Sequence, residues 1–107
     1  MQMTDKKTET YEAIVAQAAR AAGCTPEGTD PVVLRLKFYF LVPKSRARSL
    51  TEGSPHIQRP DLDNCIKSIK DGLNGVAWRD DCCVTKLEAT KVWTHKEPGA
   101  EVEIIYG

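Results

Sequence analysis

Two segments of the chain repeat apolar residues every three to four positions, which is the spacing of an amphipathic helix. Residues 9–22 are the first, and Gly23 after them is a typical helix stop. Residues 62–73 are the second, with an apolar stripe of Leu62, Ile66, Ile69 and Leu73. Both segments are therefore expected to be helices with one buried face.

Three further segments are expected to be strands. Residues 32–42 alternate apolar and polar side chains, and one face carries Leu34, Leu36, Phe38, Phe40 and Val42. Residues 83–94 alternate less regularly, which allows a bulge or burial on both faces. Residues 101–106 alternate again, and the short turn before them predicts an antiparallel hairpin of the last two strands.

The predicted order of elements is α-β-α-β-β, a small sheet with helices packed on it, so the fold class is α/β in the α+β sense. The 107 residues suit a single domain, 1–107. Residues 43–60 show no sustained period and contain three prolines. A loop of this length is usually either functional or disordered.

Composition narrows the class of protein. Hydrophobic residues make up 41% and charged residues 28%, which is typical of a soluble protein. No apolar run is long enough to span a bilayer or form a signal peptide, so we expect a cytoplasmic protein with no membrane partner. The four cysteines lack zinc-site spacing, and adjacent Cys82 and Cys83 would form a strained disulfide, so reduced thiols are expected.

The net charge is zero, but the charges are unevenly distributed. Residues 35–70 carry eight basic and three acidic side chains, and the strongest basic run consists of Lys44, Arg46, Arg48 and then Arg59. Such a run suits contact with a polyanion, although a solvated basic loop would have the same composition. Charge alone does not choose between these two interpretations.

Carboxylates gather around the start of the second predicted helix. Asp61 and Asp63 flank Leu62, so both can project to one side while the leucine enters the core. Lys67 and Lys70 follow on the polar face of the helix. Carboxylates without His or Cys suit Mg²⁺ or Mn²⁺, and a lysine one turn into the helix suits a phosphate beside that metal.

Asp80 and Asp81 follow the turn after this helix, and a third carboxylate would join the first two if the next strand ran beside the helix start. Spacing does not choose between these two residues. Each feature also has a structural interpretation: Asp61 or Asp63 as an N-cap, Asp80-Asp81 as an exposed turn, and Lys67 as an ion-pair partner of Asp63. Spacing alone leaves both interpretations open.

The whole string resembles the RusA family of Holliday junction resolvases, bacterial and prophage enzymes that cut four-way DNA junctions using Mg²⁺ or Mn²⁺. The matching residues are Asp61-Leu62-Asp63-Asn64, Lys67, Asp71-Gly72-Leu73-Asn74-Gly75 and Trp78-Arg79-Asp80-Asp81. The spacing matches throughout, and the resemblance covers residues 5–106. It implies a small mixed sheet with helices packed on it.

The resemblance also implies a crossover junction endodeoxyribonuclease, a hydrolase of DNA recombination and repair that acts on branched DNA as a homodimer. Its catalytic, metal-binding carboxylates would be Asp61, Asp63 and Asp81. Lys67 would steady the scissile phosphate, and Asn64 and Asp80 would support the site by hydrogen bonding. Contacts to the DNA backbone would come from Lys44, Arg46, Arg48, Arg59 and Lys70.

The chain departs from the family pattern at its beginning, because family members usually have a strand and a basic loop before the first helix. Without that strand and loop, an alternative function is a junction-binding module with impaired catalysis. A nucleotide phosphohydrolase is a third hypothesis, but the sequence has no glycine-rich phosphate loop or aromatic cluster for a base. The dimer surface is not defined by the sequence, and one candidate is the exposed strand face with Val33, Tyr39 and Leu41.

Overall fold

The computed structural model describes residues 8–24 and 31–107, with side chains from residue 13 onward. Helix α1 spans Thr8–Ala21 and helix α2 spans Leu62–Leu73. The remaining elements are the strands β1 (Val32–Leu41), β2 (Val84–Thr94) and β3 (Gly99–Tyr106) and the short 3-10 helices η1 (Lys44–Arg46) and η2 (Asp81–Cys83). The predicted order α-β-α-β-β is confirmed.

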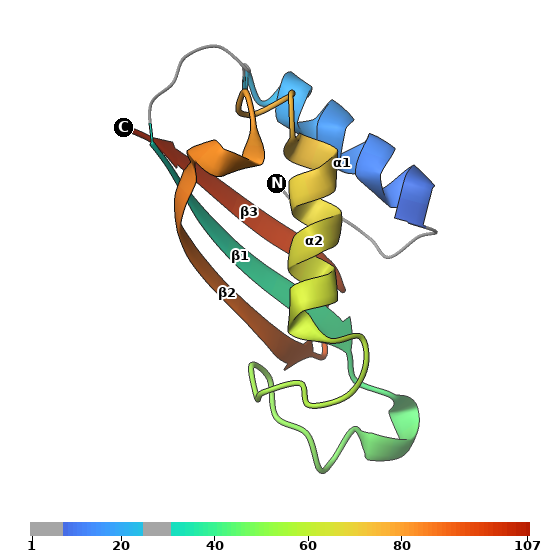
Figure 1. The fold of residues 1–107 in the computed structure, drawn as a ribbon. Helices are drawn as coiled ribbons and strands as arrows, with labels where there is room; N and C mark the ends of the chain where they lie inside the picture. The colour runs from blue at the N-terminus through green and yellow to red at the C-terminus, as the bar shows by residue number, and fades with distance from the viewer. Residues whose placement is uncertain (1–7, 25–30) are drawn as a thin grey trace.

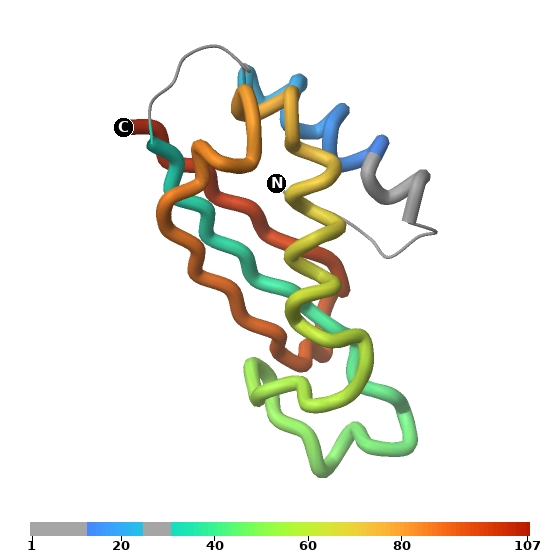
Figure 2. The backbone as a smooth tube through the Cα atoms, in the orientation of Figure 1, coloured from blue at the N-terminus to red at the C-terminus, as the bar shows by residue number. Residues whose placement is uncertain are grey.

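β1 is the central strand of a three-stranded mixed sheet with the order β2-β1-β3. It pairs in parallel with β2 and antiparallel with β3. The predicted hairpin of β2 with β3 is therefore wrong, because these two strands lie on opposite edges of β1. The crossover through α2 makes β2 parallel to β1, and the turn after β2 crosses the end of β1 to reach its other edge (Figure 2).

Both helices cover the same face of the sheet, and α2 lies across it beside α1 (Figure 1). Burial of each large apolar side chain between these layers stabilises the fold by about 1.5–3 kcal/mol. The core formed by α1, α2 and β1 contains Val15, Ala19, Ile69, Leu73, Val32, Leu34, Leu36 and Phe38. The apolar stripes of the two predicted helices and the first strand therefore meet in one core.

β2 contains the irregularity that its imperfect alternation allowed. Val84 lies opposite Val32, but Lys86 lies opposite Val33, so Thr85 is an extra residue between the two pairs. After this bulge, the strand places Lys91 opposite the buried Phe38. A lysine therefore occupies a position that faces the helices.

Residues 43–60 form the predicted loop, but its second half is bonded to the outer edge of β2. The Gly53 N–H donates to the Trp93 carbonyl at 2.9 Å, and the Trp93 N–H donates to the Ser54 carbonyl at 2.9 Å. The His56 N–H donates to the Lys91 carbonyl at 3.1 Å. The backbone of residues 53–56 is therefore hydrogen-bonded to β2 much as an edge strand would be, and this fixes the path of the loop toward α2.

No disulfide joins the four cysteines, all of which lie in the part of the chain that the structure describes. Neither α1 nor α2 is long and apolar enough to cross a membrane.

Candidate active site

Asp61 and Asp63 lie together at the start of α2, and both side chains are exposed. Asp61 occupies the N-cap position with extended backbone angles (φ −66°, ψ 147°), yet its side chain makes no capping hydrogen bond. The Oδ1 atom of Asp63 accepts from the Asn64 backbone N–H at 3.1 Å. An N-cap aspartate normally uses its carboxylate for a capping hydrogen bond. Because Asp61 makes no such bond, its carboxylate is available for a ligand.

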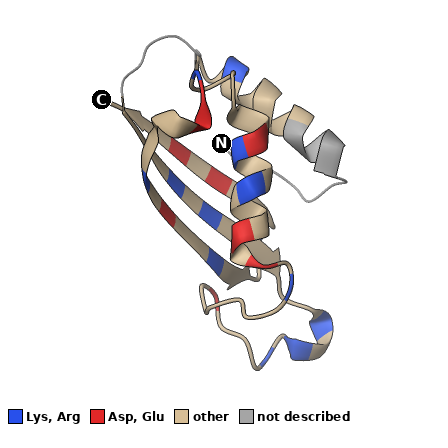
Figure 3. Cartoon of the chain, viewed as in Figure 1, with Lys and Arg blue, Asp and Glu red and all other residues tan. Residues whose placement is uncertain are grey.

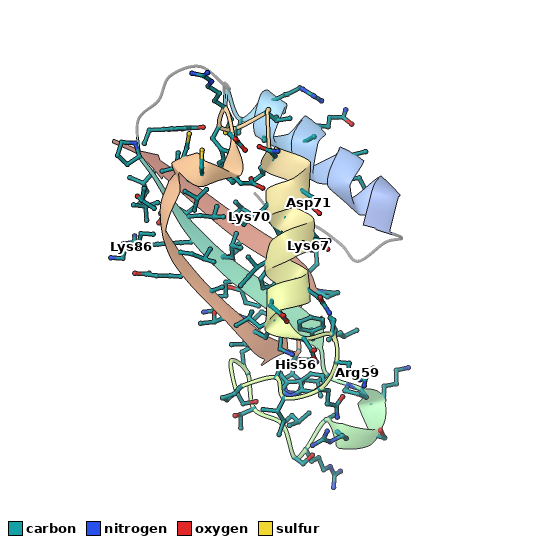
Figure 4. The ribbon with its side chains drawn as sticks, viewed as in Figure 1. His56, Arg59, Lys67, Lys70, Asp71 and Lys86 are labelled. Carbon is teal, nitrogen blue, oxygen red and sulfur yellow. The ribbon has the colours of Figure 1, made fainter. Side chains whose placement is uncertain are left out.

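The next turns of α2 place Lys67 and Lys70 on the side of the helix away from the core (Figure 4). Lys67 is exposed and Lys70 is half-buried. Within the part of the chain that the structure describes, no ion pair joins Lys67 to Asp63. The alternative interpretation of Lys67 as a helix ion-pair partner therefore has no support from the geometry.

The basic arm, defined here as Lys44, Arg46 and Arg48, lies in and just after η1, at the end of the molecule where α2 begins (Figure 3). All three side chains are exposed. Arg59, two residues before Asp61, is also exposed and lies beside the start of α2 (Figure 4). Four of the five cations predicted to contact DNA are thus at the same end of the molecule as Asp61, and the fifth, Lys70, is in the last turn of α2.

Asp80 and Asp81 have different environments. The Asp80 Oδ1 atom accepts from the Asp81 backbone N–H at 2.7 Å and caps η2. The Asp81 Oδ1 atom accepts from the indole N–H of Trp78 at 2.8 Å, and Trp78 is buried. Asp80 therefore stabilises a turn, whereas Asp81 is a half-buried carboxylate oriented by a rigid aromatic side chain.

Asp81 lies at the opposite end of α2 from Asp61. It precedes the first residue of β2, whereas Asp61 follows Pro60, whose carbonyl accepts from Lys91 near the other end of that strand. The seven steps from Val84 to Lys91 correspond to about 23 Å along a strand. Within the described residues, no group of three or more acidic, histidine or cysteine side chains is placed to hold a metal ion.

Comparison with known proteins assigns a family. Residues 1–105 match the family described as endodeoxyribonuclease RusA. The chain belongs to the RusA family. It is also 34% identical over 103 residues to Uncharacterized protein YqaN of Bacillus subtilis strain 168, an alignment that covers 88% of this chain and 68% of that protein. RusA membership makes the chain a member of an endodeoxyribonuclease family.

In this RusA-family chain, two residues near the site were not predicted from the sequence. Lys91 donates through its Nζ atom to the carbonyls of Gln58 and Pro60, both at 2.6 Å. His56 is only 5% exposed and lies between Phe40 (ring centroids 4.0 Å apart, stacked) and Trp93 (4.4 Å). The signal for Lys91 was a lysine at an inward position of β2; nothing in the sequence pattern singled out His56.

Burial lowers the pKa of His56 below its usual value, and the charge of Lys91 acts in the same direction. Its Nδ1 atom is buried and has no hydrogen-bond partner among the described residues. The neutral ring therefore packs between the side chains of Phe40 and Trp93. It anchors the loop at a point five residues before Asp61.

The face of the sheet away from the helices balances its own charges. Arg35 pairs with Glu88 at 3.1 Å and with Glu103 at 3.0 Å, and the hydrogen bond that it donates to Glu103 is the largest cause of its raised pKa. At one end of this face Leu41 is 53% exposed. Among the described residues of this RusA-family chain, the cations of α2 and of the basic arm form no ion pair.

Proposed function

We propose that this chain is a divalent-metal-dependent, structure-selective endonuclease that resolves Holliday junctions in DNA recombination and repair. The observation that carries the proposal is the pair of exposed carboxylates at the start of α2, of which Asp61 makes no capping bond. Lys67 follows one turn later. Membership of an endodeoxyribonuclease family makes the phosphodiester bond of DNA the natural target of these groups.

The donor set fits Mg²⁺, or Mn²⁺ in its place. Asp61 and Asp63 offer only oxygen ligands, and Mg²⁺ is commonly held by one or two carboxylates together with water and substrate phosphate. When bound there, the metal would polarise a phosphoryl oxygen and activate a water for in-line attack. Asp61 and Asp63 would hold it, and the exposed ammonium of Lys67 would neutralise charge on the scissile phosphate.

The basic arm and Arg59 would hold the DNA backbone, because their exposed cations lie at the end of the molecule where the carboxylates lie. Lys70, one turn beyond Lys67 along α2, would extend this contact. Because bacterial and phage DNA recombine in the cytoplasm of the cell, such an enzyme would act there.

Asp81 would act from a second copy of the chain. The stretch of β2 from Val84 to Lys91 that separates it from Asp61 is about 23 Å long, too long for one metal ion to bind both within one chain. In a twofold homodimer, the two ends of α2 from different copies can meet, and two sites result, one for each strand of a junction. The proposal therefore gives Asp81, oriented by Trp78, to the site of the partner copy.

The test is cleavage of a synthetic four-way junction by the purified chain with Mg²⁺, with Mn²⁺ and with excess EDTA. We expect symmetric cuts with either metal and none in EDTA, and we expect Asp61→Asn to abolish cutting while the circular dichroism spectrum is retained. Cleavage that persists in EDTA would overturn the metal mechanism. Junction binding without cleavage under any metal would instead identify a DNA-binding module.

A further inference from the structure

The segment that leads into Asp61 is fixed at several points before α2 begins. Residues 53–56 are bonded to β2, and the His56 ring is stacked on Phe40 at a centroid distance of 4.0 Å. On the helix side, the carbonyl of Asp61 accepts from the Cys65 N–H at 3.2 Å, in the first turn of α2. Between these two fixed points, the carbonyls of Gln58 and Pro60 both accept from one ammonium group, that of Lys91.

Lys91 is unusual for a charged side chain because it is half-buried on the helix-facing side of β2. It forms no ion pair with the residues that the structure describes. Its Nζ atom lies 2.6 Å from each of the two carbonyl oxygens and 5.9 Å from the centre of the Phe40 ring. Carbonyl dipoles and an aromatic face thus take the place of a carboxylate partner.

We propose that Lys91 is a positioning residue for the metal ligand Asp61, an inference that rests on the proposed metal-dependent function. The Pro60 carbonyl belongs to the same planar peptide group as the Asp61 nitrogen. Fixing that oxygen therefore fixes the orientation of the peptide plane from which the Asp61 side chain projects. The ammonium group holds the backbone on one side of Asp61, the helix holds the other, and the carboxylate stays exposed.

A simpler role for Lys91 would be to anchor the loop, and a second anchor in the same loop separates the two roles. Glu52 accepts from the Thr94 hydroxyl at 2.8 Å and from the His95 N–H at 2.6 Å. This anchor also joins the loop to β2, but it is nine residues before Asp61. If Lys91 only anchors the loop, removing either contact should have the same effect on metal binding.

The test uses the full chain and measures Mn²⁺ binding from the loss of the free-ion electron paramagnetic resonance signal. We expect Lys91→Met to weaken Mn²⁺ binding by about tenfold, the lower end of the range for residues that orient a metal ligand. Saturating Mn²⁺ should then restore most of the rate of junction cleavage. Lys91→Arg, which keeps donors for both carbonyls, should bind Mn²⁺ within about threefold of the wild type. The matched control Glu52→Met, which removes both acceptors of the other anchor, should bind like the wild type.

Wild-type Mn²⁺ affinity in a folded Lys91→Met chain would overturn the proposal, as would equal losses in Lys91→Met and Glu52→Met. If Lys91→Met does not fold, Lys91→Gln takes its place, and it must weaken Mn²⁺ binding for the proposal to stand. These failures differ from failure of the proposed function. In that case the wild-type chain itself neither binds Mn²⁺ nor cuts junctions, and the positioning role is rejected together with it.

Discussion

A mixture of two inactive variants, Asp61→Asn and Asp81→Asn, should recover junction cleavage. In the proposed dimer, each site takes Asp61 and Asp63 from one copy and Asp81 from the other, because these residues lie at opposite ends of α2. A mixed dimer then has one site with both substitutions and one site with none. Each variant alone has a substitution in both sites and should lose more than about 100-fold in rate, since loss of a ligand exceeds loss of a supporting contact.

The magnitude of the recovery follows from the geometry of the dimer. Equal amounts of the two variants, exchanged at random, give half mixed dimers, each with one intact site of two, so about a quarter of the wild-type number of sites is recovered. One intact site cuts one strand only. On a supercoiled plasmid that extrudes a cruciform, wild-type protein should therefore yield linear product, whereas the mixture should yield nicked circles.

The matched control is a mixture of Asp61→Asn with Asp63→Asn. Both residues come from the same chain in each site, so every mixed dimer has a substitution in both sites and the mixture should stay inactive. Native mass spectrometry establishes whether mixed dimers have formed. If they have formed and the mixture of Asp61→Asn with Asp81→Asn cuts no faster than either variant alone, the shared site is refuted.

Two further predictions concern the loop before Asp61. Because burial holds the pKa of His56 below its usual value, the unfolded chain binds a proton near pH 6.5 that the folded chain resists. Stability should therefore be full above about pH 6.5 and fall as the pH drops below it, and His56→Phe should reduce this fall when urea midpoints are compared at pH values of about 7.5 and 5.5; an unchanged pH dependence would contradict the reasoning. Replacing Lys44, Arg46 and Arg48 by Gln should lower the slope of log affinity for a junction against log salt by up to about 2.7, if each cation contacts one phosphate, and an unchanged slope would remove the basic arm from the DNA interface.

Local signals located α2 with the bounds observed. Pro60 keeps the preceding residue out of a helix, Asn74-Gly75 stops the helix, and the apolar stripe between them needs no information from the rest of the chain. The pairing of β2 and β3 was predicted wrongly because a short turn indicates a hairpin only when no third strand lies between its arms. That third strand is β1, which is more than forty residues earlier in the sequence.

The candidate site likewise has one part that local sequence predicts and another that depends on contacts between distant segments. Asp61 and Asp63 are neighbours in sequence, so their proximity was predictable from the helix start alone. The place of Asp81 depends on the direction of β2, which is determined by the crossover and not by local spacing. The contacts of Lys91 with Gln58 and Pro60 join residues about thirty positions apart, and they exist only because the loop folds back along β2.

The attachment of the loop to β2 also determines the thermodynamics of DNA binding. A disordered basic segment that folds on its target loses roughly 1–2 kcal/mol of backbone entropy for each residue it orders. In this chain the arm is already hydrogen-bonded, since the Arg46 N–H donates to the Pro43 carbonyl at 2.9 Å and the following segment is bonded to β2. Association should therefore be driven by the entropy of released counterions, with only a small change in heat capacity.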